Sequence, residues 1–422
     1  MVGQTRRASG RARPHARARR QAAKACWQEC QKRSLMIAPP NASPPPSSPL
    51  TSLIQQRIAD EGPITVAQFM ALALGHPEHG YYQQADPFGA QGDFTTAPEI
   101  SQCFGEMIGL WLVQAWRDAG SPAPFNLVEL GPGRGTLMAD ALRAAALDPS
   151  FVAAAQLYMV EISTRLRAIQ QERVPQLVTH LDHTSALTST LPDHYTLVVA
   201  NEFFDALPIR QFVKHSEGWR ERRVTLDPDT GRFAFALTPL GIGDDKLLPP
   251  HASEASAGSI VETSTASLQA MADISQRLRQ SGGAALLIDY GYGAQDWPAK
   301  GPQGRLFAET LQALKAHERW PVLDQPGLAD ITAHVDFNAL ALTAAEHNLR
   351  IAPLATQGAF LQRLGLGHRL AQLLDATTDD KARQNLETGT VRLVDPDQMG
   401  HLFKVLAICD PKHPPLAGLE NI

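Results

Sequence analysis

The sequence predicts an α/β fold in which helices cover both faces of a mostly parallel sheet, with an antiparallel β insertion and helical additions at both ends. Four short apolar runs alternate with helix-like segments, and runs without polar alternation are typical of parallel strands buried on both faces. The runs are FNLVEL (125–130), QLYMVEI (156–162), YTLVVA (195–200) and AALLIDY (284–290). With 422 residues, 44% of them hydrophobic and 19% charged, the chain can bury one large core and a sizeable insertion.

The first 50 residues are expected to form a disordered leader that is basic at first and then rich in proline. Residues 1–33 contain ten Lys and Arg but one acid, Glu29, so their net charge is +9 and the rest of the chain carries −14. Three interpretations stay open: a tail that binds polyanions, an organellar targeting peptide, or sequence upstream of a true start at Met36, which we favour. The acidic remainder argues against a broad nucleic-acid surface.

Cysteine and apolar patterns restrict the class of protein further. No apolar run reaches 18 residues, so we expect no membrane insertion. The four cysteines are too few and too scattered for a disulfide framework, which fits a reducing compartment. Cys26 and Cys30 lack a second pair at zinc spacing, and Pro77 keeps His76 and His79 off a regular helical face. We therefore expect free thiols, structural histidines and no metal site.

A helical region that includes a lid is expected over residues 51–120. Its segment TVAQFMALALG predicts a helix that begins at Thr65, with a capping box to Gln68, and ends at Gly75. A loop with several glycines follows, and residues 80–97 are expected to fold over a bound ligand.

A second helix in this region is expected to begin at Pro98, because proline suits the first helical turn, and to end at Gly120. Its apolar residues recur with a period of 3.6, which predicts one face turned toward the core. They are Ile100, Phe104, Met107, Ile108, Trp111, Leu112, Ala115 and Trp116.

The sheet-forming core is expected to comprise residues 121–208 and 264–410, interrupted by a β-rich insertion at 209–263. The insertion alternates polar and apolar residues as antiparallel strands do, with a turn at 227–231. The end of the core is expected to be mostly helical with LFKVLAICD as a final strand, followed by a tail at 411–422.

The stretch LVELGPGRGTL places three glycines between the first predicted strand and a helix. Glycine at such a turn permits positive φ and lets a ligand approach the backbone. Gly131 and Gly133 fit the first two places of the dinucleotide pattern G-x-G-x-x-G, but Thr136 stands at the third. The observed pattern is E-x-G-x-G-x-G, from Glu129 to Gly135, and an acid there suits a cationic ligand better than a pyrophosphate. Candidate binding residues are Glu129, Gly131, Pro132, Gly133, Gly135 and Thr136.

Further acids follow the neighbouring strands. Glu161 ends the second strand, 32 residues after Glu129, and Asp182 and His183 follow the third. A single acid at a strand end is often merely solvated, but two acids at successive strand ends favour a shared ligand site.

The fourth strand leads into VVANEFFDALP, where Asn201, Glu202 and Asp205 surround two phenylalanines. We expect these three polar residues to be catalytic, and one of the two phenylalanines to be core. Glu202 and Asp205 pairing structurally with Arg210 or Lys214 is the alternative.

Seven motifs occur in order along the chain. They are GDFTTAPEISQCFGEMIG, ELGPGRGTLMADALR, MVEIS, ANEFFDALPIRQF, LLIDYG, DITAHVDF and TQGAFLQRLG. This succession, from about residue 53 to residue 410, resembles the MidA family, which includes a mitochondrial methyltransferase for complex I assembly and bacterial relatives. The basic leader has no counterpart in the resemblance.

The resemblance implies a Rossmann-like class I methyltransferase sheet and S-adenosylmethionine as cofactor. It also implies a protein arginine N-methyltransferase that makes symmetric dimethylarginine on a respiratory-chain subunit. By motif, Glu129, the three glycines and Glu161 would hold the cofactor, with Asn201, Glu202 and Asp205 beside the methyl group. Bidentate binding by these two carboxylates would fix the acceptor guanidinium, with Glu99 as a possible third acid.

Two functions from other classes are weighed against this one. A non-catalytic assembly chaperone would need neither the glycine turn nor the strand-end acids, and an NAD-dependent oxidoreductase would need a third glycine at Thr136. The acceptor and the oligomeric state, including a possible homodimer, are open. A bacterial cytoplasmic location is favoured, with the mitochondrial matrix expected if the leader is a transit peptide.

Overall fold

The computed structural model describes residues 48–84, 96–239, 241, 247–293 and 309–419. Cys26, Cys30, Met36 and most of the expected lid lie outside these ranges. Within them, no helix has the length and apolar character needed to cross a membrane.

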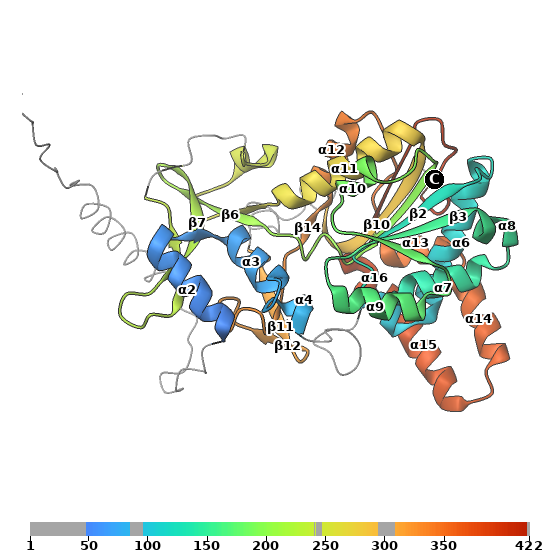
Figure 1. Ribbon diagram of the computed structural model, residues 1–422, viewed down its shortest axis with the longest axis horizontal. Helices are drawn as coiled ribbons and strands as arrows, with labels where there is room; N and C mark the ends of the chain where they lie inside the picture. Colours follow the sequence, from blue (N-terminus) through green and yellow to red (C-terminus); the bar gives the residue numbers. More distant parts are fainter. Residues whose placement is uncertain (1–47, 85–95, 240, 242–246, 294–308, 420–422) are drawn as a thin grey trace, which may run out of the picture.

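A nine-stranded sheet forms the centre of the molecule (Figure 1). Its strand order is β15-β17-β10-β5-β2-β3-β4, with β14 also paired to β10 and β16 to β17. Strands β10, β5, β2, β3 and β4 are parallel, and β17 is antiparallel to β10. The bounds are β2 Phe125–Leu130, β3 Ala155–Val160, β4 Val178–Leu181, β5 Thr196–Asn201, β10 Gly283–Tyr292, β14 Val335–Asp336, β15 Arg350–Ile351, β16 Ala355–Thr356 and β17 Phe403–Cys409. The predicted parallel sheet and final strand are confirmed.

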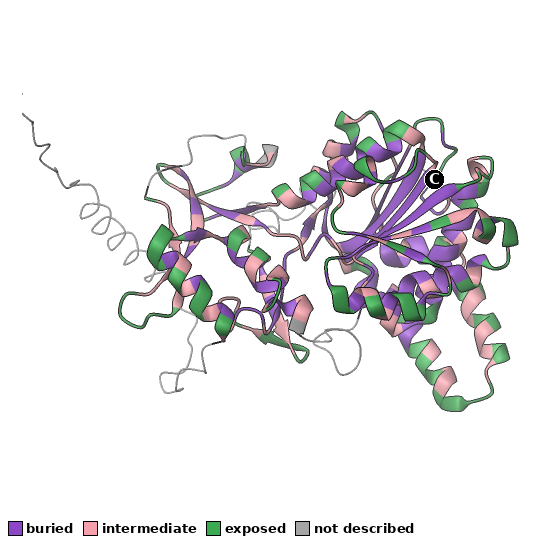
Figure 2. Ribbon diagram, viewed as in Figure 1, coloured by how far each residue is buried: buried purple, intermediate pink, exposed green. Residues whose placement is uncertain are grey.

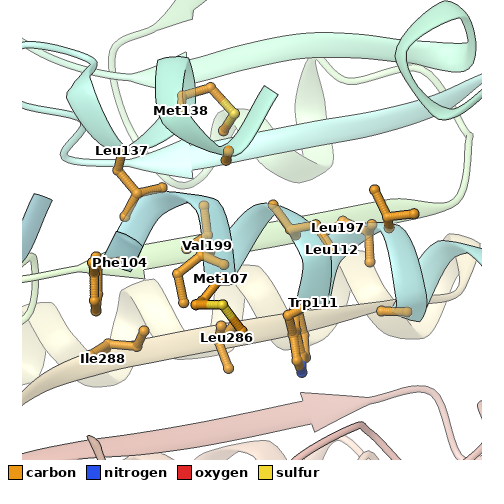
Figure 3. Packing of buried hydrophobic residues seen from close by; sticks show 14 of the residues in the cluster. Phe104, Met107, Trp111, Leu112, Leu137, Met138, Leu197, Val199, Leu286 and Ile288 are labelled. Atoms are coloured by element: carbon orange, nitrogen blue, oxygen red, sulfur yellow. The ribbon is translucent and has the colours of Figure 1, made fainter. Parts of the chain in front are cut away.

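Helices cover both faces of this sheet, and Figure 2 shows its strands almost wholly buried. Leu127 and Val199 face one layer, whereas their neighbours Val128 and Val198 face the other, as the two-residue period of strands requires. Figure 3 shows Phe104 and Met107 of one helix packing near Val199 and Leu286 on the first face. The helices of the first layer include α6 Gln102–Asp118, α7 Thr136–Ala145 and α8 Pro149–Ala154, and those of the second include α10 Ala186–Ser189, α11 Thr265–Ser281 and α12 Phe337–Glu346.

The remaining helices flank this core. Helix α9, Thr164–Arg173, links β3 to β4. The C-terminal helices are α13 Gln357–Arg363, α14 Leu366–Ala376, α15 Asp380–Val394 and α16 Met399–Leu402. Figure 1 shows α14 and α15 projecting as a pair from one end of the molecule.

The helix predicted from Pro98 to Gly120 is divided in two, so that prediction is wrong in this detail. A short helix, α5 Ala97–Ile100, ends at Ser101, whose backbone is extended (φ −154°, ψ 128°). The Ser101 hydroxyl then accepts a hydrogen bond from the Cys103 N–H at 3.3 Å and begins α6. Serine favours such a cap because its oxygen satisfies a free N–H of the first turn.

A second lobe joins segments that lie far apart in the sequence (Figure 1). Its larger sheet has the order β1-β7-β6-β9 with β8 on β7, and its smaller one is β12-β11-β13. Side chains from α3, β7 and β13 share one core, including Phe69, Val224 and Ile331. The elements are α2 Pro49–Glu61, β1 Ile64–Thr65, α3 Val66–Gly75, α4 Tyr81–Gln84, β6 Arg210–His215, β7 Gly218–Leu226, β8 Phe233–Leu237, the 3-10 helix Pro250–Glu254, β9 Ile260–Thr263, β11 Gln312–Lys315, β12 Glu318–Trp320 and β13 Asp330–Thr332. The capping box of Thr65 and Gln68 is confirmed.

The contact between α6 and α7 depends on glycine. A Cβ on Gly109 would lie 2.3 Å from the Ala141 carbonyl oxygen, so the two helix backbones could not keep their present distance. Alanine usually favours a helix over glycine by about 1 kcal/mol, but here we expect Gly109→Ala to destabilise the fold by roughly 2 kcal/mol through overpacking. Urea unfolding followed by circular dichroism measures the change.

Gly367→Ala in α14 is the matched control, since nothing lies within 4 Å of its added Cβ. It should leave stability unchanged or raise it slightly. Equal effects of the two substitutions would show that α6 and α7 do not require the glycine.

Candidate active site

A cavity of about 1030 Å³ lies at the carboxyl ends of β2, β3 and β5, between the core sheet and the second lobe. Strand order changes direction between β2 and β5, which is where open parallel sheets bind ligands. The lining includes every predicted site residue except Gly135: Glu129, Gly131, Pro132, Gly133, Thr136, Glu161, Asp182, His183, Asn201, Glu202 and Asp205.

The three glycines of the turn all adopt positive φ, with values of 61° at Gly131, 53° at Gly133 and 78° at Gly135. This conformation explains why three glycines follow the strand, because residues with a Cβ are strained there. A Cβ at Gly131 would also lie 2.9 Å from the Phe203 ring. Gly135 packs against α9 behind the turn and caps α7, so it shapes the cavity without lining it.

Glu129 is a buried carboxyl without a compensating charge. Its side chain is 3% exposed, and Oε2 has no hydrogen-bond partner among the described residues. Burial raises the pKa of Glu129 to about 8. A cationic ligand beside it would restore the ionised form, whereas a pyrophosphate would be repelled. The site therefore fits the amino-acid and sulfonium part of S-adenosylmethionine.

Glu161 is also buried, but its carboxylate has partners. Oε1 accepts a hydrogen bond from the Ser163 N–H at 2.7 Å, and Oε2 accepts one from Gln170 Nε2 at 3.3 Å. Burial raises the pKa of Glu161, and these donors oppose the rise. Gln170 also donates to the Gly133 carbonyl at 2.7 Å, which ties the second strand end to the glycine turn. Gln170 was not predicted, because nothing in its local sequence distinguishes it from other polar residues of a helix.

Asp182 lies at the cavity edge with His183, and its carboxylate already forms an ion pair with a side chain of the protein. Arg167 donates to Asp182 Oδ1 at 2.5 Å, and this pairing lowers the pKa of the exposed Asp182 carboxyl. The arginine also donates to the Glu161 carbonyl. Arg167 thus anchors the Asp182 loop beside the second strand end.

The loop after β5 brings the predicted catalytic residues together. Glu202 has φ 51°, an uncommon value for a residue other than glycine. Its Oε1 accepts hydrogen bonds from the Ala97 N–H and from Asn201 Nδ2, both at 3.1 Å. The Asn201 Oδ1 is buried and has no partner among the described residues. Burial, and then the charge of Asp205, raises the pKa of Glu202 to about 7.

Asp205 shares this environment. It is 6% exposed, and burial raises its pKa to about 6. Neither Glu202 nor Asp205 forms an ion pair with a described basic side chain. The structural alternative is wrong, because Arg210 pairs with Glu221 at 2.7 Å and Lys214 lies over the Trp219 ring.

The structure also shows where Phe203, Phe204 and Glu99 lie relative to the site. Phe204 is buried in the core while Phe203 lines the cavity, so one of the two is core as expected. Glu99 accepts a hydrogen bond from the Thr136 hydroxyl at 2.5 Å, which places it at the glycine turn.

His76 and His79 stack and support a turn: the N–H groups of Glu78 and His79 both donate to His76 Nδ1 at 3.2 Å. In the described part of the chain, no group of three His, Cys, Asp or Glu residues is arranged to hold a metal.

Further cavity residues, which were not predicted, come from the second lobe and β10. Tyr82 of α4 and Asp330 of β13 both line the cavity, and the Tyr82 hydroxyl donates to Asp330 at 3.3 Å. Tyr290 reaches it from β10. The signal for Asp330 and Tyr290 was present in the motifs DITAHVDF and LLIDYG, but only the fold brings them together.

Comparison with known proteins agrees with this geometry. The fold and site define a methyltransferase that uses S-adenosylmethionine. A family model, Methyltransf_28, described as S-adenosyl-L-methionine-dependent methyltransferase, matches residues 107–354, and the chain belongs to this family. S-adenosylmethionine rather than NAD is therefore the cofactor, and the protein is an enzyme rather than only a chaperone.

Curated relatives extend over nearly the whole chain. Protein arginine methyltransferase NDUFAF7, mitochondrial, from Xenopus laevis is 34% identical, covering 87% of each chain. The protein of the same name from Mus musculus is 35% identical, covering 86% of this chain and 84% of its own. A Burkholderia thailandensis crystal structure bound to S-adenosyl-homocysteine is 29% identical with a TM-score of 0.72, covering 90% of this chain and 96% of its own.

Proposed function

We propose that the protein transfers the methyl group of S-adenosylmethionine to an arginine side chain of a protein. The observation that carries this proposal is a pair of acids, the half-buried Glu202 and the buried Asp205, which lack a described basic partner and line the same cavity as Glu129. A buried carboxylate without a cation is costly, so the site is complete when a cation enters. The relatives whose names state protein arginine methylation support the same acceptor.

The chain's own groups suit a guanidinium acceptor. Arginine stays protonated and delocalised, so it attacks poorly unless its charge is held away from one nitrogen. Glu202 and Asp205 can draw that charge toward two N–H groups through charge-assisted hydrogen bonds. Bound S-adenosylmethionine supplies a methyl group on a sulfonium. Glu202, Oε1 of which is already used by Ala97 and Asn201, has a pKa of about 7 and can accept the proton that the methylated arginine releases.

We assign the cofactor roles as proposals. Glu129 would face the cationic part, Glu161 the ribose hydroxyls, and Gly131 to Thr136 the backbone side of the ligand. Asp182 and His183 would border the adenine. Gly135 supports the turn from behind.

The cellular location, the methylated product and the target protein are inferred from the relatives. The mitochondrial names of several relatives support a matrix location for this protein, with the bacterial cytoplasm as the other possibility. Symmetric dimethylarginine and a client such as a respiratory complex I subunit are the product and target that we propose. A homodimer is left to measurement.

The test is incubation of the protein with isotope-labelled S-adenosylmethionine and a cell lysate, followed by mass spectrometry of labelled peptides. We expect the label on arginine, as symmetric dimethylarginine, and its loss with Glu202→Gln. Labelling of lysine, of a carboxyl group or of a small molecule would contradict the proposal.

A further inference from the structure

The end of β10 holds the backbone of the loop that carries Glu202 and Asp205. Asp289 is 1% exposed, and its Oδ2 accepts hydrogen bonds from the N–H groups of Phe204 at 3.0 Å and Asp205 at 3.1 Å. Its Oδ1 accepts the Tyr290 N–H at 2.9 Å. A carboxylate used on both oxygens by backbone donors fixes the loop relative to the sheet, and Asp289 itself does not line the cavity.

The neighbouring Tyr290 acts on the Asp205 side chain rather than on the loop backbone. Tyr290 and Asp205 both line the cavity, and hydrogen bonding by Tyr290 lowers the pKa of the Asp205 carboxyl. Burial, followed by the charges of Asp205 and Asp289, raises the pKa of Tyr290 far above its ordinary value, so the hydroxyl stays protonated and donates. The ring packs edge-on against His334 and Phe403, with centroids 5.3 and 5.5 Å away, which fixes where the hydroxyl points.

Two backbone bonds complete the support. The Glu202 N–H donates to the Ile288 carbonyl at 2.9 Å, and the Ala333 N–H donates to the Asp205 carbonyl at 3.0 Å. Glu202 needs such support, because a glutamate at φ 51° is strained unless its surroundings impose that conformation.

We propose that Asp289 and Tyr290 are positioning residues for the acceptor: Asp289 fixes the loop backbone, and Tyr290 aims the Asp205 carboxylate so that it and Glu202 hold one guanidinium. This inference rests on the proposed function. It predicts that the two residues act on turnover and acceptor binding and leave cofactor binding alone.

The surroundings of Asp205 determine the sign of the pH effect. The acidic and phenolic groups near this carboxyl are Glu202 on its own loop, Asp289 and Tyr290 on β10, Tyr82 on α4 and Asp330 on β13. Two basic side chains lie beside these neighbours: His334 packs against Tyr290, and Lys404 of β17 stands opposite Asp289 in the sheet. Arg392 of α15 is the cation that acts on Glu202. Burial raises the pKa of Asp205, and the Tyr290 hydrogen bond lowers it by favouring the charged form. Loss of that bond therefore raises the pKa.

The first test is Tyr290→Phe, with the pH dependence of kcat/KM for an arginine peptide as readout. Ionised Asp205 binds the acceptor, so activity rises with pH through its pKa. We expect the acidic limb to move up by about one pH unit, with roughly fivefold lower activity at pH 6 and an unchanged Kd for S-adenosylmethionine. Tyr195→Phe is the matched control, because this half-buried tyrosine lies just before β5 at the opposite end of the strand, and its limb should not move.

The second test is Asp289→Asn, which keeps the shape but replaces one acceptor oxygen by a donor that faces backbone N–H groups. We expect kcat to fall roughly 100-fold while the calorimetric Kd for S-adenosylmethionine stays within about twofold. An equal loss of cofactor affinity, or a limb unmoved by Tyr290→Phe in a folded protein, would overturn the proposal.

A readout independent of activity separates this inference from the proposed function. In protein labelled with ¹³C at the aspartate carboxyl, the Asp205 resonance is assigned with Asp205→Asn and titrated without any substrate. A higher Asp205 pKa in Tyr290→Phe supports the positioning role even if arginine is not the acceptor. An unchanged Asp205 titration contradicts it even if arginine methylation is found.

Discussion

Replacing Glu202 with glutamine is expected to lower kcat for arginine methylation by roughly 10²- to 10³-fold, while the affinity for S-adenosylmethionine is retained. The amide keeps the size of the side chain but removes the charge that holds the guanidinium and accepts its proton, and effects of this order follow from losing one such group. Steady-state kinetics with an arginine peptide, together with calorimetric titration of the cofactor, measures both quantities.

Glu217→Gln is the matched control, because Glu217 is an exposed acid of the second lobe that pairs only with Arg220 among the described contacts. It should leave kcat and cofactor affinity unchanged. Normal turnover by Glu202→Gln with cofactor bound would remove Glu202 from the catalytic role.

Replacing Glu129 with glutamine is expected to weaken S-adenosylmethionine binding by roughly 100-fold. The pKa of Glu129 is about 8 in the free protein, so its carboxyl is largely protonated at neutral pH. A cationic ligand favours the ionised form, so wild-type binding should release a proton near pH 7 and strengthen as pH rises toward 8. Calorimetry in two buffers of different ionisation enthalpy measures this proton release, which Glu129→Gln should abolish.

The same group affects stability in the free protein with the opposite sign. The folded pKa of Glu129 is raised above its ordinary value of 4.5, so the folded state binds more protons than the unfolded state between those values. Wild-type stability should therefore fall as pH rises from about 5 to 8, by up to a few kcal/mol, and Glu129→Gln should lose less. A variant that is less stable than wild type at pH 8 and binds cofactor normally would contradict this account of Glu129.

Much of the fold follows from local pattern. The four apolar runs predicted β2, β3, β5 and β10 within two residues at each end, since strands buried on both faces need continuous apolar sequence. Thr65 and Gln68 predicted a helix start because a capping box acts over three residues. The helix break at Ser101 was not predicted. The apolar residues keep their 3.6-residue period before and after Ser101, so the sequence pattern shows no gap where the backbone becomes extended.

The parts of the site that could be predicted from the sequence are those that come from a single contiguous segment. Glu129 to Thr136 and Asn201 to Asp205 each form a contiguous stretch after a strand, so their spacing indicated a ligand. Tyr82 of α4 and Asp330 of β13 line the cavity, and Gln170 of α9 holds Glu161 and the Gly133 carbonyl from outside it. No sequence spacing relates these three residues to the glycine turn. Their placement depends on long-range packing, which for Tyr82 and Asp330 is the packing between the second lobe and the sheet.

The most direct test of the central claim is a crystal structure of this protein with S-adenosyl-homocysteine. We predict that the ligand lies at the ends of β2 and β3, with its amino-acid part near Glu129, its ribose near Glu161 and its sulfur toward Asn201 to Asp205. A ligand bound elsewhere, or a cavity closed by Phe203 with no ligand beside the glycine turn, would contradict it.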